Sequence, residues 1–266
     1  MSYGSMITMF VDSHFHIFNK DDPQPTARYV IDYDASITQW FALAKPMGIS
    51  KGVLVQPSFL GIDNNRILRT IQQYPKELRG IGVVEPHTTQ KELKDLKKQG
   101  IMGIRLNLYE DQNPHDALEK YINLFNHLKD VGMHVEIHHN DGLLNDLLLQ
   151  IPAGIQIVID HFGRPKTTDE FQKNAQGIDK HLGQVWVKLS APYRTSTINH
   201  HAVFQYWLEK IGPSKLLWGS DWPHTGYESS VRYEKQFEDF VNLVNNQELT
   251  KKILIDNPIN LYWSQV

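Results

Sequence analysis

Two patterns of apolar and polar positions alternate along this chain. Short runs of β-branched and other apolar residues recur between longer stretches in which apolar side chains return with helical spacing. The short runs predict strands at Phe10–Ile17, Gly52–Gln56, Gly80–Glu85, Gly103–Leu106, His134–His138, Ile155–Asp160, Val185–Ser190 and Leu216–Ser220. Because these runs are apolar almost throughout, we expect a parallel sheet that is covered on both faces.

Helices are predicted between and after these strands. They are marked by the stripes Ile37/Phe41/Ala44, Ile67/Leu68/Ile71 and Leu93/Leu96 and by Ala117–Val131, Leu143–Leu149, Phe171–Leu182, Val203–Ile211 and Val231–Val244. Strict alternation over roughly 250 residues is typical of an α/β protein built as a (β/α)8 TIM barrel, with its active site at the C-terminal ends of the strands. An open doubly wound sheet is less favoured, since no strand precedes a glycine-rich nucleotide motif. We expect a single barrel domain over residues 1–266, closed at one end by a helix after Asn257-Pro258.

The composition narrows the class of protein. The chain has 266 residues, 41% of them apolar, and 27 basic against 30 acidic residues give a net charge of −3. The absence of cysteine excludes thiolate zinc sites, cysteine nucleophiles and disulfides. The N-terminus lacks a secretory signal, and no apolar run of about 18 residues predicts a membrane span. We expect a cytoplasmic protein that acts on a small-molecule substrate and binds neither nucleic acid nor membrane, with its oligomeric state left open.

Histidine placement points to chemistry, since the chain has 13 histidines. His14 and His16 end the first predicted strand and, with a period of two, point to the same face. His138 ends the fifth strand, His161 follows the sixth, and Asp221 follows the eighth. In a barrel these five side chains would meet at the rim where catalytic groups of this fold collect.

Each of these residues also has a structural interpretation. His-x-His pairs occur without a function, His138 could simply be a buried ring, and Asp221 could cap the segment that follows it. Together, however, four imidazoles and a carboxylate are costly to bury unless they bind a ligand or one another. Asp221 would then be a general base for water, and the histidines would stabilise an oxyanion. A divalent ion would assist by lowering the pKa of bound water.

A series of motifs covers nearly the whole chain. They are Val11-Asp12-Ser13-His14-Phe15-His16, Gln56-Pro57-Ser58, Asp63-Asn64-Asn65, Gly103-Ile104-Arg105, Asp160-His161-Phe162-Gly163-Arg164-Pro165, Val187-Lys188-Leu189-Ser190 and Gly219-Ser220-Asp221-Trp222-Pro223-His224. This pattern resembles the amidohydrolase-2 family of the amidohydrolase superfamily, and within it the 2-pyrone-4,6-dicarboxylate lactonase-like group. The resemblance implies that His14, His16 and His161 polarise a lactone carbonyl. It also implies that Asp221 activates water.

The same resemblance implies that Ser58, Arg105 and Arg194 hold carboxylate groups of the substrate. A guanidinium suits that role because it binds a carboxylate through two parallel hydrogen bonds, although each arginine could instead form a salt bridge at the barrel rim. His224 is close enough in sequence to Asp221 to join the substrate-binding residues or to lie in a surface loop.

Two features depart from that group. The stretch Leu106–Asp111 is acidic where the pyrone-dicarboxylate enzymes have a further basic residue, and His138 stands where they have a tyrosine. The resemblance to the pyrone-dicarboxylate enzymes implies a catalyst that works without a metal. The residues of this chain that could bind one divalent ion are His14, His16, His138 and Asp221. The cofactor is therefore expected to be either none or one divalent metal ion, zinc or manganese.

The leading hypothesis is a hydrolase that opens a lactone, the cyclic ester of a small carboxylated molecule. An alternative is a metal-dependent decarboxylase, which also occurs among amidohydrolase-2 relatives. A third is a non-catalytic binder of small molecules that has kept the pocket. Assays of ring opening and of CO2 release would separate the first two hypotheses, and binding without turnover would support the third.

Overall fold

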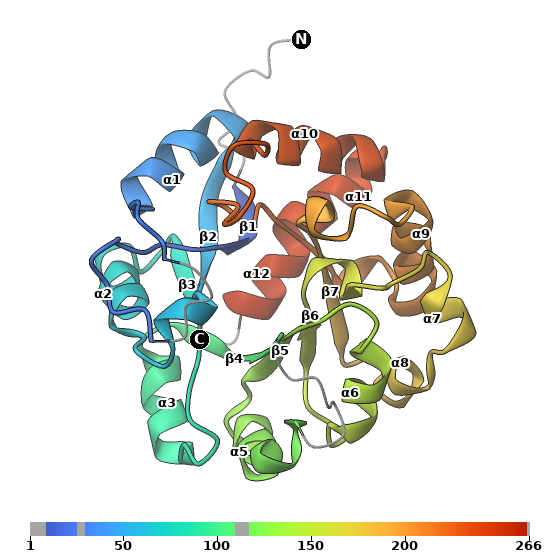
Figure 1. The fold of residues 1–266 in the computed structure, drawn as a ribbon, viewed down its shortest axis with the longest axis horizontal. Helices are drawn as coiled ribbons and strands as arrows, with labels where there is room; N and C mark the ends of the chain where they lie inside the picture. Colours follow the sequence, from blue (N-terminus) through green and yellow to red (C-terminus); the bar gives the residue numbers. More distant parts are fainter. Residues whose placement is uncertain (1–8, 26–29, 110–116, 265–266) are drawn as a thin grey trace.

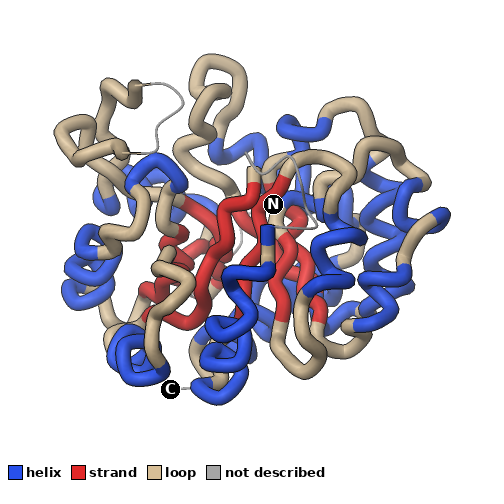
Figure 2. Tube along the Cα trace, turned by 60° about the horizontal axis from the view of Figure 1, so that its bottom comes forward, coloured by secondary structure: helices blue, strands red, loops and turns tan. Residues whose placement is uncertain are grey.

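Eight parallel strands lie inside a ring of helices in the computed structural model, which describes residues 9–25, 30–109 and 117–264 (Figure 1, Figure 2). The strands are β1 (Phe10–Phe15), β2 (Ile49–Val55), β3 (Leu78–Gly82), β4 (Ile101–Leu108), β5 (His134–His139), β6 (Ile157–Ile159), β7 (Val185–Ser190) and β8 (Leu216–Gly219). They pair in parallel and in sequence order from β1 to β8. All eight predicted strands are confirmed, with bounds that differ by a few residues.

Helices cover the outside of the strands. They are α1 (Ile37–Ala44), α2 (Asn65–Gln73), α3 (Gln90–Lys98), α5 (Ile122–Val131), α6 (Leu144–Gln150), α7 (Glu170–Lys173), α8 (Gln176–Lys180), α9 (His200–Ile211), α10 (Tyr233–Val244), α11 (Gln247–Lys251) and α12 (Asn257–Tyr262). The connecting 3-10 turns are η1 (Lys45–Met47), η2 (Ser58–Leu60), η3 (Glu119–Tyr121), η4 (His161–Gly163), η5 (Pro192–Thr195) and η6 (Pro213–Lys215), and η7 (Lys252–Asp256) is a π-helical turn. This alternation confirms the predicted (β/α)8 TIM barrel.

Two helices begin at a capping box, which satisfies backbone groups that a helix start leaves unpaired. At α1 the Ser36 hydroxyl accepts from the backbone of Gln39, whose side chain accepts from the backbone N–H of Ser36. Thr89 and Glu92 form the same reciprocal pair at the start of α3. These local signals explain why each helix begins where it does.

The barrel is nearly closed by a seam between β8 and β1. Just beyond β8, the backbone N–H of Asp221 donates to the carbonyl of His14, and the N–H of His16 donates to the carbonyl of Trp222, both at 2.8 Å. The two segments approach so closely that a Cβ on Gly219 would lie 2.4 Å from the Cβ of His14. Only glycine fits at this point, and the seam places the first and last strand ends side by side.

A buried carboxylate pins the same seam. Both oxygens of Asp12 accept hydrogen bonds, Oδ1 from the backbone of Ser220 and of His14, and Oδ2 from the Ser220 hydroxyl. Oδ2 also accepts from Nε1 of Trp40 on α1 and from the hydroxyl of Tyr233 on α10, each at 3.0 Å. Asp12 thereby joins β1, the segment after β8 and two outer helices.

Apolar packing fills two regions. The larger one lies between strands and helices and includes the fully buried Trp40, Phe125 and Trp207. The smaller one fills the barrel interior near the N-terminal ends of the strands, where Leu261 and Tyr262 of α12 pack on inward-facing strand residues. In Figure 1, α12 crosses the middle of the ring of strands. The predicted closing helix is confirmed, and it leaves the opposite end of the barrel for the polar residues.

Two predicted helices are wrong in extent. The segment Phe171–Leu182 contains two short helices, α7 and α8, and the backbone of Asn174 between them is extended (φ −146°, ψ 95°). α8 packs so tightly on α6 that a Cβ on Gly177 would lie 2.4 Å from the backbone oxygen of Asn145, whose side chain accepts from the N–H of Gly177. The predicted helix Ala117–Val131 is shortened to α5, preceded by the turn η3. Tertiary packing overrides helical periodicity at α7 and α8.

None of the helices in the described part of the chain is long and apolar enough to cross a membrane.

Replacing Asp12 with alanine should destabilise the fold by about 3 kcal/mol, because it leaves the buried donors of the seam without an acceptor. Tyr233→Phe removes one of these donors and should cost about 1 kcal/mol. Urea unfolding followed by circular dichroism measures both. Equal stability of Asp12→Ala and the parent protein would show that Asp12 does not hold the seam.

Candidate active site

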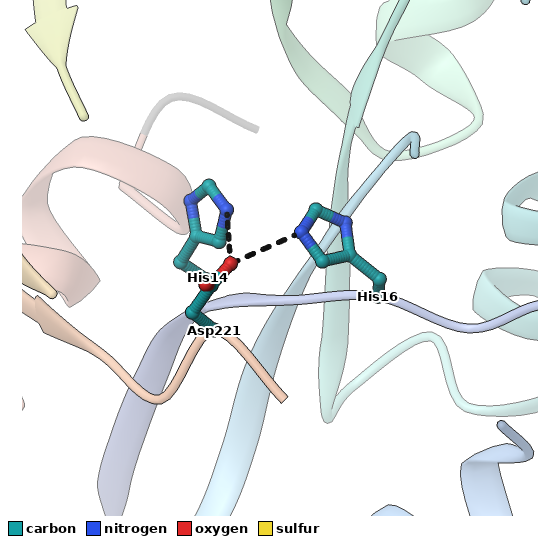
Figure 3. A group of neighbouring side chains, drawn as sticks. All are labelled: His14, His16 and Asp221. Carbon is teal, nitrogen blue, oxygen red and sulfur yellow. Dashed lines mark hydrogen bonds and ion pairs between the residues drawn. The ribbon is translucent and has the colours of Figure 1, made fainter. Parts of the chain in front are cut away.

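Asp221 meets two histidine rings at the C-terminal ends of the strands. His14 lies in β1, His16 directly after it, and Asp221 two residues beyond β8. Oδ1 of Asp221 lies 3.3 Å from Nε2 of His16 and 3.6 Å from Nε2 of His14 (Figure 3). Nε2 of His161, at the start of η4, is 4.0 Å from the same oxygen. Asp221 and His161 have left-handed backbones (φ 58° and 51°), a strained conformation that is typical of functional sites.

The other oxygen of Asp221 is held by two donors that follow β7. The Tyr193 hydroxyl donates to Oδ2 at 2.6 Å and Nε of Arg194 at 2.7 Å. Nη2 of Arg194 also donates to the carbonyl of Thr225. Oδ2 of this carboxylate therefore accepts both hydrogen bonds, whereas Oδ1 faces the histidines.

Burial and charge set the protonation of these groups. Burial is the largest single influence on the pKa of Asp221 and raises it, but the Arg194 guanidinium and the neighbouring histidine rings together outweigh burial and hold that pKa well below its usual value. Burial lowers the pKa of His161 to about 3, although the nearby carboxylates oppose it. Burial and the Lys188 ammonium lower the pKa of His14 well below the usual value. At neutral pH the site therefore holds an ionised Asp221 with neutral His14 and His161.

The partners of Nδ1 determine which ring nitrogen carries the hydrogen. Nδ1 of His16 lies 2.8 Å from the carbonyl of Val55, which can only accept, so Nδ1 donates, and Nε2 lies within hydrogen-bond distance of Oδ1 of Asp221. In the neutral form of this ring Nε2 carries a lone pair. Nδ1 of His14 lies 3.1 Å from Nζ of Lys188, and an ammonium can only donate. Nδ1 of His14 also lies 3.3 Å from Oδ1 of Asp160, which would accept a hydrogen there. Donation by Lys188 favours the tautomer of His14 with its hydrogen on Nε2, in which the two rings present opposite groups to Asp221.

A divalent ion fits this arrangement by distance but not by hydrogen bonding. His14, His16 and Asp221 each offer one ligand atom within 4.8 Å of the others, and so do His14, Asp160 and His161. A metal ligand needs a ring nitrogen without hydrogen, which Nε2 of His14 is not. In the second group, the Lys188 ammonium lies against Nδ1 of His14. With the hydrogen of His14 on Nε2, the residues present therefore do not fit a divalent metal ion.

These residues lie at the base of a pocket of about 450 Å³. Its lining residues are His16, Ile31, Pro57, Ser58, Phe59, Arg105, Tyr109, His138, Asp141, His161, Arg164, Arg194, Asp221, Thr225, Gly226 and Tyr227. His14 is fully buried beneath these lining residues, and its ring centroid lies 5.0 Å from those of His16 and His161. Ligand-type residues that are far apart in sequence thus converge on one opening, as the strand-end argument predicts.

Of the other predicted site residues, Ser58 and His138 line the pocket and His224 does not. Ser58 lines the pocket at the start of η2. His138 also lines it, but its Nδ1 lies 2.9 Å from Oδ1 of Asn107 and its ring stacks on Tyr109. Among the described residues, His138 belongs to neither group that could hold a metal. His224 is outside the pocket lining, and its ring lies edge-on to Tyr193, behind the wall.

The arginines of the pocket are all paired. Arg105 donates through Nε and Nη2 to Asp160, which is only 1% exposed. Arg164, which the sequence argument gave no role, donates to Asp141 at 2.7 Å and lies over the ring of Tyr109. The acidic stretch expected after β4 includes residues 110 and 111, which lie outside the described residues.

The sequence argument also missed a charged group beneath the pocket. Lys188, Glu136 and Asp160 are almost completely buried, and Nζ of Lys188 donates to Oε2 of Glu136 at 2.7 Å. One signal was present: β7 is an apolar run that contains a single charged residue, Lys188, and in β5 Glu136 stands between the apolar Val135 and Ile137. A charge inside a buried strand needs a partner, and here the two strands supply it to each other.

The chain is similar to known proteins along nearly its whole length. A family model described as Amidohydrolase matches residues 11–263. 4-Sulfomuconolactone hydrolase of Rhizobium radiobacter is 32% identical over 94% of this chain and 89% of that protein. 2-Pyrone-4,6-dicarboxylate hydrolase of Comamonas testosteroni is 29% identical over 96% of this chain and 90% of that protein.

A solved structure agrees with these matches. It is described as a probable 2-pyrone-4,6-dicarboxylic acid hydrolase of Acinetobacter baumannii with citric acid bound. It superposes with a TM-score of 0.86 at 36% identity and covers 95% of this chain and 98% of that chain.

Arg194→Met should raise the pKa of Asp221, because it removes the charge that opposes burial of the carboxylate. Carbon-13 NMR of labelled aspartate carboxyl groups, with the signal assigned by its loss in Asp221→Asn, follows the titration. The midpoint should move to higher pH in Arg194→Met and stay in place in Arg164→Met, which removes a guanidinium bound elsewhere. An unmoved midpoint in Arg194→Met would contradict the assignment.

Proposed function

We propose, from the premise that this chain belongs to the amidohydrolase family, that it opens the ring of a lactone that carries anionic groups. The match over residues 11–263 and the lactone-hydrolase relatives confirm the family resemblance read from the motifs. The chain is an enzyme that acts on ester bonds. The observation that carries the proposal is the carboxylate of Asp221, ionised, facing three imidazoles at the base of a pocket.

Water would be oriented by two acceptors. In the proposed state His16 is neutral, and its Nε2 and Oδ1 of Asp221, 3.3 Å apart, are two neighbouring acceptors that one water molecule can bridge. A water molecule that donates one hydrogen to each keeps a lone pair for the acyl carbon. Asp221 then takes the proton as general base. In this proposal His16 orients water, whereas the family resemblance gave it a role in polarising the carbonyl.

The carbonyl oxygen would be stabilised by the other two rings. His161 lines the pocket, and the Ser190 hydroxyl lies 2.9 Å from its Nδ1, so donation by the serine leaves a hydrogen on Nε2. Nε2 of His14 carries its hydrogen at the floor. Both donors can lie against the oxyanion that forms when water adds.

Ring opening then balances the proton. The tetrahedral adduct collapses, the acyl carbon–ring oxygen bond breaks, and the oxyanion returns to a carbonyl. Asp221 transfers its proton to the departing ring oxygen and is again ionised. Lactone and water give one hydroxy acid, or its keto tautomer where the ring oxygen was enolic.

Anionic groups on the substrate are supported by the arginines of the wall. Asp141, the partner of Arg164, is 39% exposed in its side chain and can turn to solvent when a substrate anion replaces it. Asp160, the partner of Arg105, is buried and holds that guanidinium in place. An anion that also contacts Arg194 would weaken its hold on Asp221 and make the general base stronger. Arg164 therefore joins Ser58 and Arg194 as a proposed substrate-binding residue.

Asp221→Asn should reduce kcat for lactone hydrolysis by about 10³-fold or more, because the amide cannot accept the proton of water. The test uses 2-pyrone-4,6-dicarboxylate, 4-sulfomuconolactone and uncharged lactones, with ring opening followed by absorbance and chromatography. Thermal unfolding controls for folding of the variant. Unchanged turnover would remove Asp221 from the mechanism, and CO2 release from aromatic acids without ring opening would favour the decarboxylase.

Arg164→Met should raise KM for an anionic lactone by about 10- to 100-fold, the worth of a hydrogen bond to a charged group, with a smaller effect on kcat. An uncharged lactone with the same ring is the matched control and should show little change. Steady-state kinetics of both substrates decides. Equal effects on the two would show that Arg164 supports the pocket without binding the anion.

A further inference from the structure

Four charged side chains are buried together beneath the pocket. Lys188 and Glu136 have no exposed side-chain surface, and Arg105 and Asp160 have 4% and 1%. Two basic side chains face two carboxyl groups that differ in charge: burial and the neighbouring Asp160 raise the pKa of Glu136 to about 8, whereas the pKa of Asp160 is held well below its usual value by His14, Arg105 and Lys188. Such a cluster costs desolvation free energy without adding much stability, so its retention calls for a role beyond holding the barrel together.

Lys188 connects this cluster to the active site. Its Nζ lies 2.7 Å from Oε2 of Glu136, 3.7 Å from Oδ1 of Asp160 and 3.1 Å from Nδ1 of His14. Oε2 of Glu136 accepts a hydrogen bond from this amino group, and the Asp160 carboxylate lies on another side of it. Lys188 therefore supplies the cluster's hydrogen-bond donor to the ring of His14.

From this geometry we propose that Lys188 is a positioning residue that fixes His14 with its hydrogen on Nε2. In this tautomer the hydrogen of His14 points toward Asp221, because Nε2 of His14 is fully buried and faces Oδ1 of Asp221 at 3.6 Å. It has no hydrogen-bond partner within the described part of the chain. This unpartnered donor lies directly beneath His16, His161 and Asp221, which line the pocket. The effect of this hydrogen on turnover rests on the proposed function, whereas its position on Nε2 does not.

Asp160 gives His14 an alternative. Its Oδ1 lies 3.3 Å from Nδ1 of His14 and has no hydrogen-bond partner among the described residues. Without the ammonium, His14 would donate from Nδ1 to this oxygen and expose a lone pair at Nε2. Nε2 of His14 would then join Nε2 of His16 and Oδ1 of Asp221 as a third metal-ligand atom. Lys188 thus keeps His14 a hydrogen donor and prevents it from becoming a metal ligand.

The test compares two variants that differ only at the lysine. Lys188→Met/Glu136→Gln removes the amino group together with the carboxyl group that it is hydrogen-bonded to, so that neither is buried without the other. Glu136→Gln alone is the matched control and keeps the lysine beside His14. Long-range proton–nitrogen NMR of protein labelled with nitrogen-15 histidine reports which ring nitrogen carries hydrogen. The His14 signal is assigned by its absence from His14→Asn.

We expect hydrogen on Nε2 of His14 in the parent and in Glu136→Gln, and on Nδ1 in the double variant. Zinc, titrated by calorimetry, should bind the double variant more tightly than the control. The double variant should lose kcat by roughly 10²-fold relative to the control, the effect of removing one oxyanion donor, with KM little changed. Hydrogen on Nδ1 in the parent overturns the proposal, and so does hydrogen on Nε2 in the double variant.

Folding does not decide the result, because the parent and Glu136→Gln test the assignment even if the double variant fails to fold. Failure of the proposed function is also distinguishable. A protein that opens none of the lactones but shows the expected ring hydrogens and zinc binding would refute the lactonase and leave the role of Lys188 in place.

Discussion

The residues to which the proposed mechanism assigns the chemistry also complete the barrel. The seam between β8 and β1 consists of hydrogen bonds from the backbones of Asp221 and His16, and Asp12 ties the same segments to two helices. Because the seam fixes both backbones, the carboxylate of Asp221 cannot move away from the two rings unless the barrel opens. The close approach at Gly219 removes the remaining freedom. Stability and the geometry of the candidate site are thus set by one group of contacts, and the proposed general base is in position without a substrate.

Burial turns hydrogen-bond partners into protonation states. In water a histidine exchanges its ring hydrogen freely, whereas in a buried site the partner of one nitrogen decides the other. A backbone carbonyl beside His16 and an ammonium beside His14 give two chemically identical rings opposite roles. The two oxygens of Asp221 differ for the same reason. Oδ2 accepts hydrogen bonds from Tyr193 and Arg194, whereas Oδ1 is the proposed acceptor for water. The site is asymmetric because its surroundings are.

The sequence was sufficient for the fold and for the rim on which the site lies. Strand runs are apolar and short, so His14, His16, His161 and Asp221 could be placed at strand ends before any coordinates. Tertiary partners could not be predicted in this way. Nothing in the local pattern shows that His224 lies behind Tyr193 or that α7 and α8 are separate.

Lys188 illustrates the same limit. A charge in an apolar strand signalled that a partner exists, but only the folded barrel shows that its neighbours are Glu136 and His14. The role of an arginine also depends on its partner. Arg105 matches a substrate-binding motif, yet a buried Asp160 occupies it, whereas Arg164 has a partner that solvent can reach.

The most direct measurement of the central claim is a single turnover of an active lactone in oxygen-18 water. If Asp221 activates water, the new carboxylate of the product carries one labelled oxygen, and Asp221 recovered by peptide mass spectrometry carries none. Label in the Asp221 carboxylate, with an unlabelled product, would show that this residue attacks the carbonyl itself and would contradict the account.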